Sequence, residues 1–384
     1  MADFAFREEA VLEAARQATG LADFGDPGFR EGLRVLLETY EKTAGFHDKG
    51  RRRYWRRVVQ LLSTRLRVEE AFKRNPEIRA RRIRSPIYLT GLPRTGTSAL
   101  FNLLAIDPAA RPLLLWEGIF PDPLESPEPG KPDPRYLAIK AQYERFRARD
   151  PDFSRIHFVS ADTPEECVLL LSHDFCDAQM GIEVMMEPYA SWFQAQDLRR
   201  PYAYYRELLK VLDWQRPGER WLLKSPAHLW ALDVLVEMFP DACIVLTHRN
   251  PLEAIASACS LTDTLMAVRA SHDRRALGPA VLEYYARSLE RGLSARDAGD
   301  PARFADVDYR TFVDDPLAAV RGIYTRFALP LPRTVEDAMR AHVRANPQGK
   351  HGAHEYALEE YGLSPEAVKA RLAPYIERFY LPTD

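Results

Sequence analysis

The chain has 384 residues, of which 46% are hydrophobic, and its formal net charge is −2. This length suits one large α/β domain with additions or two modest domains, and the hydrophobic content excludes a chain that is disordered throughout. A charge so close to zero gives no electrostatic reason to expect a nucleic-acid partner.

The distribution of apolar residues and cysteines predicts a soluble cytoplasmic protein. Residues 1–20 mix charged and apolar residues at helical spacing, unlike a signal peptide. The sequence contains no run of about 18 apolar residues, which excludes a transmembrane helix. We expect free buried thiols in a reducing compartment, because CxxC spacing is absent from the four cysteines, Cys167, Cys176, Cys243 and Cys259.

Residues 1–84 are predicted to form an N-terminal helical region. Apolar residues recur there at intervals of three and four, as in Leu33, Leu36, Leu37 and Tyr40. The basic run 51–57 interrupts the apolar pattern, and three interpretations stay open for it. It is a solvated helix face, a contact with a neighbouring subunit, or a patch that steers phosphate groups.

The pattern changes after Ser85, where a second region, residues 85–384, is predicted to begin. A β-rich run at 87–90 leads into a glycine loop and a new helix. Residues 121–134 are rich in proline and acidic residues and are predicted to form a loop. Helical patterns follow at 134–149, 163–175 and 197–215, so we interpret about 109–215 as an insertion.

Further strands are predicted at 221–223, 242–247 and 303–307, with helices between them. One of these helices starts at Pro251, because proline is favoured in a first helical turn. The alternation of strand and helix predicts an α/β fold with a mostly parallel central sheet and helices on both faces.

A phosphate-binding loop is predicted directly after the first strand, at residues 91–98. Gly91 and Gly96 have the spacing of a nucleoside-triphosphate P-loop, between a strand and a helix start whose N–H groups attract anions. Thr97 stands where that loop has its lysine, and a cation is found earlier instead, at Arg94. Binding of Mg-ATP also needs an acidic residue at the end of a strand to hold the magnesium, but the strand at 242–247 is soon followed by Arg249. The site therefore suits a phosphate better than Mg-ATP. A metal site is not predicted.

The segment Pro93-Arg94-Thr95-Gly96-Thr97-Ser98 resembles the loop of the PAPS-dependent sulfotransferase family, whose donor is 3'-phosphoadenosine 5'-phosphosulfate. The resemblance covers about residues 85–355 and is closest to the broad bacterial branch. It implies a P-loop-like fold and assigns the 5'-phosphosulfate to Arg94, Thr95, Gly96, Thr97 and Ser98. Many members carry lysine where Arg94 stands, and arginine keeps the charge in a planar fork.

Other segments resemble further parts of the family's donor site. Arg249, and Ser257 eight positions later, match the pair that binds the 3'-phosphate, and a guanidinium with a hydroxyl suits a dianion. Lys224 lies in a segment similar to the family's LK-[ST]-P-x-H strand end. Tyr309 matches a tyrosine near the nucleotide. A late loop of the family that closes over the 3'-phosphate is matched by Gly349 and Lys350.

The resemblance implies sulfuryl transfer without a metal, in which Arg94 and Lys224 stabilise charge on the leaving 5'-phosphate. An acceptor hydroxyl needs a general base, which is histidine or glutamate in different branches. Glu117 follows the first core helix, where glutamate-using members have their base, and is favoured. His157 is the next candidate, and the remaining ones are Glu165, Glu166 and His173.

The expected function is transfer of a sulfuryl group from PAPS to the hydroxyl of a small lipophilic alcohol or phenol, with PAP as the second product. Aromatic residues in the insertion favour a lipophilic acceptor. Two alternatives stay open: a P-loop small-molecule kinase, and a non-catalytic nucleotide-binding module. The identity of the acceptor and the formation of a homo-oligomer also stay open.

Overall fold

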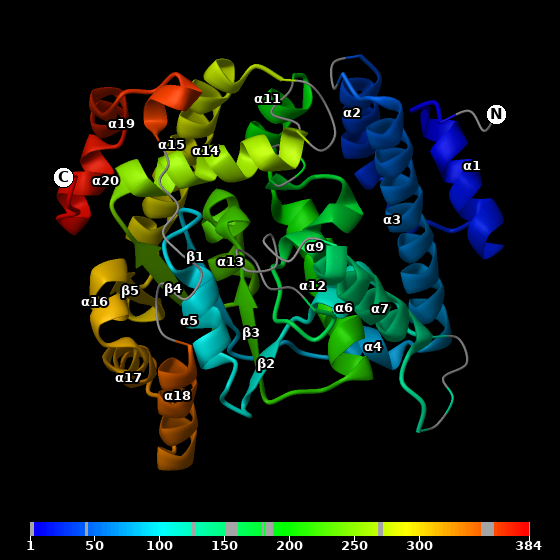
Figure 1. Ribbon diagram of the computed structural model, residues 1–384. Helices are drawn as coiled ribbons and strands as arrows, with labels where there is room; N and C mark the ends of the chain where they lie inside the picture. The colour runs from blue at the N-terminus through cyan, green and yellow to red at the C-terminus, as the bar shows by residue number, and fades with distance from the viewer. Residues whose placement is uncertain are drawn as a thin grey trace.

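A computed structural model describes most of the chain, namely residues 4–42, 45–124, 128, 130–149, 160–178, 180, 187–267, 272–346 and 357–383. At its centre lies a five-stranded parallel sheet with the strand order β2-β3-β1-β4-β5 (Figure 1). In chain order, the strands are β1 (Ile87–Gly91), β2 (Ala110–Pro112), β3 (Arg220–Lys224), β4 (Cys243–His248) and β5 (Phe304–Asp308).

Helices form most of the remaining described chain. The N-terminal region contains α1 (Glu8–Thr19), α2 (Phe29–Lys42), α3 (Asp48–Arg74) and α4 (Glu77–Ala80). Between β1 and β3 lie α5 (Thr97–Leu104), α6 (Leu115–Ile119), α7 (Pro134–Arg149), α9 (Val168–Leu171), η1 (Ser172–Asp174), α11 (Tyr189–Gln194) and α12 (Arg199–Gln215). Between β3 and β5 lie η2 (Pro226–Ala231), α13 (Leu232–Met238), α14 (Pro251–Ala267), α15 (Arg274–Ala298) and η3 (Pro301–Arg303). The chain continues with α16 (Tyr309–Asp314), α17 (Pro316–Arg326), α18 (Arg333–Ala345), η4 (Leu358–Tyr361), α19 (Pro365–Arg371) and α20 (Ala373–Phe379).

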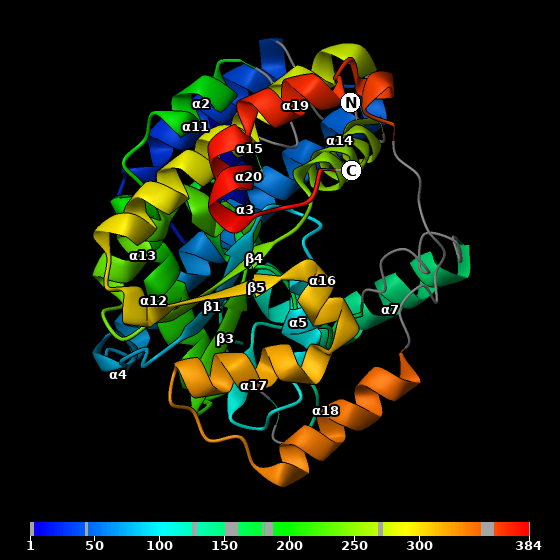
Figure 2. The ribbon, with the colours of Figure 1, turned by 90° about the vertical axis from the view of Figure 1, so that its left-hand side faces the viewer.

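Both faces of the sheet are buried, because successive side chains of a strand point to opposite faces. In β1, Ile87 and Leu89 pack with α5, α17 and α18, whereas Tyr88 joins the larger hydrophobic cluster on the other face. Figure 2 shows α17 and α18 on one side of the sheet and α13 and α15 on the other. The predicted arrangement, a parallel sheet covered by helices on both faces, is confirmed.

Four of the five strands lie within one residue of their predicted positions, and α7 has its predicted bounds. The edge strand β2 was not predicted, because its sequence, Ala-Arg-Pro, has neither length nor apolar alternation. The helix predicted at 163–175 is shorter than expected and consists of α9 and η1. None of the described helices is long and apolar enough to cross a membrane.

The N-terminal helices share the larger hydrophobic cluster with the sheet, so apolar packing is continuous between the two regions. The guanidinium of Arg65 on α3 is buried in this packing, between the rings of Phe29 and Tyr204 at 4.3 and 3.9 Å. It donates hydrogen bonds to the carbonyl oxygens of Phe24 and Asp26. Its Nη1 also lies 3.5 Å from the carboxylate of Asp174 in η1. A buried charge with these partners fixes α3 against the rest of the chain.

We expect Arg65→Ala to lower the free energy of unfolding by about 3 kcal/mol or more, because it removes the ring contacts and leaves buried acceptors without their donor. Urea unfolding followed by circular dichroism measures this change. Arg34→Ala removes an arginine of the same region that is 63% exposed and should change stability by less than about 0.5 kcal/mol. Equal effects of the two substitutions would contradict the structural role of Arg65.

Candidate functional site

The candidate site lies where the carboxyl ends of the central strands meet. β1 pairs in parallel with β3 on one side and β4 on the other. The segments that leave these strands therefore reach the same edge of the sheet: the loop at 92–96, residues 224–225, and residues 249–250. In open α/β sheets, ligands bind at this edge, next to the central strand.

The loop after β1 adopts a conformation that exposes the start of α5. Gly96 precedes the helix with φ 84°, and Arg94 also has a positive φ of 67°. A Cβ atom at Gly96 would lie 2.9 Å from the ring of Tyr309, so glycine is needed there for space as well as for conformation. The first N–H groups of a helix have no intrahelical partner, which makes the start of α5 suitable for an anion.

The hydroxyl of Thr95 points into the protein. It donates to the carbonyl oxygen of Leu92 at 2.7 Å and lies 2.6 Å from the hydroxyl oxygen of Thr247 on β4. Thr95 therefore fixes the loop against β4. Thr97 is also buried, whereas Ser98 is exposed.

The structure brings the two predicted phosphate-binding motifs together, although more than 150 residues separate them in the chain. Arg94 Nε donates to Ser257 Oγ at 3.2 Å, and Arg249 Nη1 donates to the carbonyl oxygen of Arg94 at 2.8 Å. The guanidinium of Arg249 also lies over the ring of Tyr309, 4.3 Å from its centroid. Four predicted site residues thus contact one another directly.

Lys224 joins this group from the end of β3. Its Nζ donates to Ser98 Oγ at 3.2 Å and to Glu166 Oε1 at 2.6 Å. The backbone holds the carboxylate there, because Cys167 N donates to the carbonyl oxygen of Lys224 at 3.0 Å. The hydroxyl of Ser225 lies 3.4 Å from the other carboxylate oxygen. Glu166 thus stands beside the loop, with its side chain 28% exposed.

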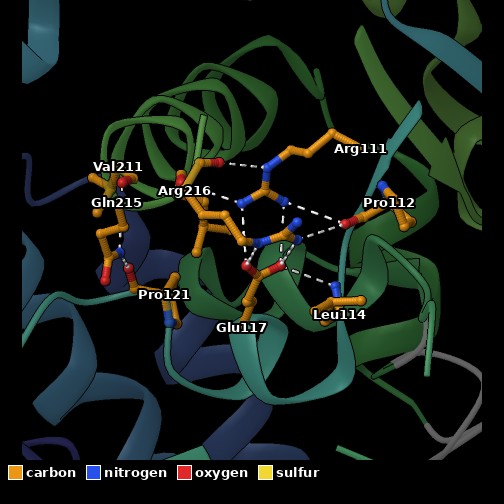
Figure 3. A network of polar contacts seen from close by, with 9 residues as sticks. Arg111, Pro112, Leu114, Glu117, Pro121, Val211, Gln215 and Arg216 are labelled. Carbon is orange, nitrogen blue, oxygen red and sulfur yellow. Dashed lines mark hydrogen bonds and ion pairs between the residues drawn. The ribbon is translucent and has the colours of Figure 1, made fainter. Parts of the chain in front are cut away.

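Glu117 lies in a different environment (Figure 3). It is only 2% exposed, and its carboxylate accepts hydrogen bonds from Arg111, from Arg216 and from the backbone N–H of Leu114. Arg111 itself lies over the ring of Trp221 at 3.7 Å. Arg111 and Leu114 belong to the same β2–α6 segment as Glu117, and Arg216 joins this segment to the end of α12.

Hydrogen bonds and charge determine the ionisation of Glu117. Burial alone would raise its pKa, but the hydrogen bond from Arg216 and the positive charges of Arg111 and Arg216 outweigh burial and lower the pKa. The carboxylate is therefore ionised at neutral pH and strongly held. A general base needs a free path to an acceptor proton, and Glu117 is surrounded by its own donors instead.

Of the remaining predicted residues, His173 is not part of this group. His173 is fully buried, and burial lowers the pKa of its ring to about 4, so it is neutral at neutral pH. His157, Gly349 and Lys350 lie outside the described residues. Within the described part of the chain, no group of three or more His, Cys, Asp or Glu side chains could hold a metal ion.

The sequence analysis did not single out two acidic residues of the site. Glu166 was one of several candidate bases, and adjacent glutamates after Thr163-Pro164 also suit the start of a helix. Glu253, which forms an ion pair with Arg249, was not predicted. Its position four residues after Arg249, at the start of a helix, is a signal that could have found it.

Comparisons with known proteins identify the family of this chain. The family model described as "Sulfotransferase family" matches residues 86–333. Omega-hydroxy-beta-dihydromenaquinone-9 sulfotransferase Stf3 of Mycobacterium bovis is 24% identical to this chain over 289 residues, which cover 73% of this chain and 72% of Stf3.

Two solved structures are similar over almost the whole chain. Sulfotransferase STF1 of Mycobacterium tuberculosis H37Rv has a TM-score of 0.85 and 34% identity, covering 96% of this chain and 98% of STF1. Sulfotransferase STF9 of Mycobacterium avium has a TM-score of 0.91 and 29% identity, covering 100% of this chain and 99% of STF9. The similarity includes the N-terminal helices, which the family model does not match.

We expect Glu117→Gln to lower the free energy of unfolding by about 3 kcal/mol or more, because it leaves buried Arg111 without its counter-charge. The pKa of Glu117 in the folded protein lies below its usual value of 4.5. Its stabilising contribution is therefore complete above that pH and is lost as the pH falls through the folded-state pKa. Urea unfolding at a series of pH values should show a smaller loss in acid for the variant than for the wild type.

Glu38→Gln is the control, since it removes an ion pair in which both side chains are about half exposed or more. Its stability should stay within about 0.5 kcal/mol of the wild type. A folded Glu117→Gln variant of unchanged stability that binds nucleotide but has lost turnover would contradict the structural role and identify Glu117 as the base.

Proposed function

The chain belongs to the sulfotransferase family, and on that premise we propose that it transfers a sulfuryl group from PAPS to the hydroxyl of a lipophilic small molecule. The observation that carries the proposal is the direct contact between the two phosphate motifs, through Arg94, Ser257 and Arg249. A nucleotide with phosphates on both its 5' and 3' positions needs two anion sites side by side, and this contact supports such an arrangement.

The 5'-phosphosulfate is assigned to the loop and the start of α5. Gly96 allows close approach of the backbone, and the N–H groups at Thr97 and Ser98 begin the helix. Arg94 and Lys224 supply positive charge on the two sides of the loop, since Lys224 reaches Ser98 from β3. This arrangement suits a leaving group on which negative charge grows during the reaction.

The 3'-phosphate is assigned to Arg249 and Ser257. A guanidinium offers paired donors to a phosphate, and a hydroxyl adds a further donor. Arg249 Nε is buried and has no hydrogen-bond partner among the described residues. The ring of Tyr309 supports the guanidinium from one side.

In the proposed reaction, the acceptor oxygen attacks the sulfur atom of PAPS in line with the bond to the 5'-phosphate. The new oxygen–sulfur bond forms as the bond between sulfur and the phosphate oxygen breaks, and PAP leaves with the electron pair of that bond. The acceptor hydroxyl loses its proton to a base. Positioning and stabilisation of charge by Arg94 and Lys224 supply most of the catalysis.

We assign the role of base to Glu166 instead of Glu117. Glu166 contacts Lys224, which contacts the loop, and its side chain is partly open to solvent. Glu117 is buried and held by two arginines. An acceptor hydroxyl bound next to Lys224 would therefore meet the Glu166 carboxylate, where it could donate its proton.

A lipophilic acceptor is supported by the surroundings of the Glu166 segment. Glu165 N donates to the carbonyl oxygen of Leu113, so the segment runs beside the start of α6. A separate apolar cluster lies there, formed by Leu115, Ile139 and Ala161 with the partly exposed Trp116, Ile119, Phe120, Tyr136, Tyr143 and Leu169. The name of the relative Stf3 gives its acceptor as an omega-hydroxy derivative of a menaquinone, which is also lipophilic.

We expect PAP to stabilise the protein against heat much more than AMP, because only PAP carries the 3'-phosphate that Arg249 and Ser257 would bind. At about 100 times its Kd, a ligand stabilises the folded state by about 2.7 kcal/mol. Thermal unfolding with PAP, AMP, ADP and Mg-ATP measures the difference. Strong stabilisation by Mg-ATP and none by PAP would contradict the proposal and favour a kinase, whereas PAP binding without any turnover would favour a binding module.

We expect Glu166→Gln to lower turnover by about 10²- to 10⁴-fold, the usual contribution of general-base catalysis. Binding of PAP should be retained, because the donor contacts assigned above do not include Glu166. Turnover of PAPS with a lipophilic alcohol, together with PAP binding by calorimetry, separates the two effects. Glu165→Gln changes the neighbouring carboxylate and should keep most of the activity. Near-normal turnover of Glu166→Gln would exclude Glu166 as the base.

A further inference from the structure

Arg249 already has an anionic partner within this chain. Its Nη2 forms an ion pair with Glu253 one helical turn further along, in the first turn of α14. The Glu253 side chain is 52% exposed, and that of Arg249 is 24% exposed. Both side chains of this ion pair are therefore partly open to solvent.

The other contacts of Arg249 leave little freedom for its side chain. Nη1 donates to the carbonyl oxygen of Arg94, and the ring of Tyr309 lies against the face of the guanidinium. Movement of the arginine toward a ligand would break these contacts. A phosphate that binds Nη2 must therefore displace the Glu253 carboxylate or lie next to it, and the second arrangement places like charges together.

Ser257 also has a partner from within the chain. Its Oγ accepts a hydrogen bond from Arg94 Nε, which leaves the hydroxyl hydrogen available to donate to a phosphate. Ser257 lies four residues after Glu253 on α14, so the two side chains share one face of the helix. Of the two groups assigned to the 3'-phosphate, Arg249 is thus the one whose partner, Glu253, competes with a phosphate.

We propose that Glu253 is a specificity-determining residue that competes with the donor's 3'-phosphate for Arg249. This inference rests on the proposed function and extends it to the release of product. Glu253 keeps Arg249 in place, weakens the binding of both PAPS and PAP, and speeds the departure of PAP by forming its ion pair again. It does not touch the reacting atoms.

The test compares two nucleotides that differ only in the 3'-phosphate, PAP and AMP, on Glu253→Gln and wild-type protein. We expect the Kd of PAP to fall by roughly 2- to 5-fold in the variant, the upper part of the range for exposed ion pairs. The Kd of AMP should change by less than about twofold, because AMP does not reach Arg249 with a phosphate. The rate of PAP dissociation, measured by stopped flow, should fall by a similar factor.

The matched control is Glu70→Gln, which removes an ion pair of the same i,i+4 type with Arg74 on α3 and should leave both nucleotides unaffected. Glu253→Asp keeps the charge and should restore a Kd close to the wild type. Glu253→Ala should behave like Glu253→Gln. The difference for PAP should also shrink at high salt, because salt screens exposed charges.

Different results would overturn the inference and the proposed function. If wild-type protein prefers PAP to AMP but Glu253→Gln binds PAP equally or more weakly, Glu253 only supports Arg249 and the inference is wrong. If wild-type protein does not distinguish PAP from AMP, the 3'-phosphate assignment itself fails. A fall in the Kd of AMP as large as that of PAP would indicate a general change of charge and would also overturn the inference.

Discussion

Parallel pairing of β1 with β3 and β4 is the constraint on which the rest of the site depends. The register places Ile87 beside Leu222 on one side and beside Cys243 on the other, so the three strands end at the same edge of the sheet. Parallel strands need helical crossovers, and these helices bury both faces. The loops at the carboxyl edge are then free to carry polar and charged side chains, while the core beneath them stays apolar.

Three cations gather at that edge, and each has a partner. Arg94 donates to a hydroxyl, and Lys224 and Arg249 each contact a carboxylate, from Glu166 and Glu253. Like charges brought together cost free energy, which these partners reduce until an anion binds. A ligand with several negative charges would therefore exchange these partners for its own contacts, and its affinity would depend on the difference between the two sets of contacts.

Buried ion pairs elsewhere have a structural role. The guanidinium of Arg65 fixes α3 against the core, and Glu117 joins the β2–α6 segment to the end of α12 through Arg111 and Arg216 (Figure 3). Glu117 and Glu166 are the same residue type in two different environments. One carboxylate is enclosed by its donors, and the other lies beside the loop with part of its surface open.

The sequence by itself determined the features that depend on a few neighbouring residues. The glycine loop, the strand that precedes it, the buried strand before Arg249 and the spacing to Ser257 are local, because conformational limits of glycine and the apolar pattern of strands act over short distances. The short edge strand β2 and the true length of α9 depend on neighbouring elements and were not predicted correctly. Only the tertiary structure decided which carboxylate lies beside the loop. Glu166 and Lys224 are 58 positions apart, and their contact exists because the backbone of Cys167 is hydrogen-bonded to the end of β3.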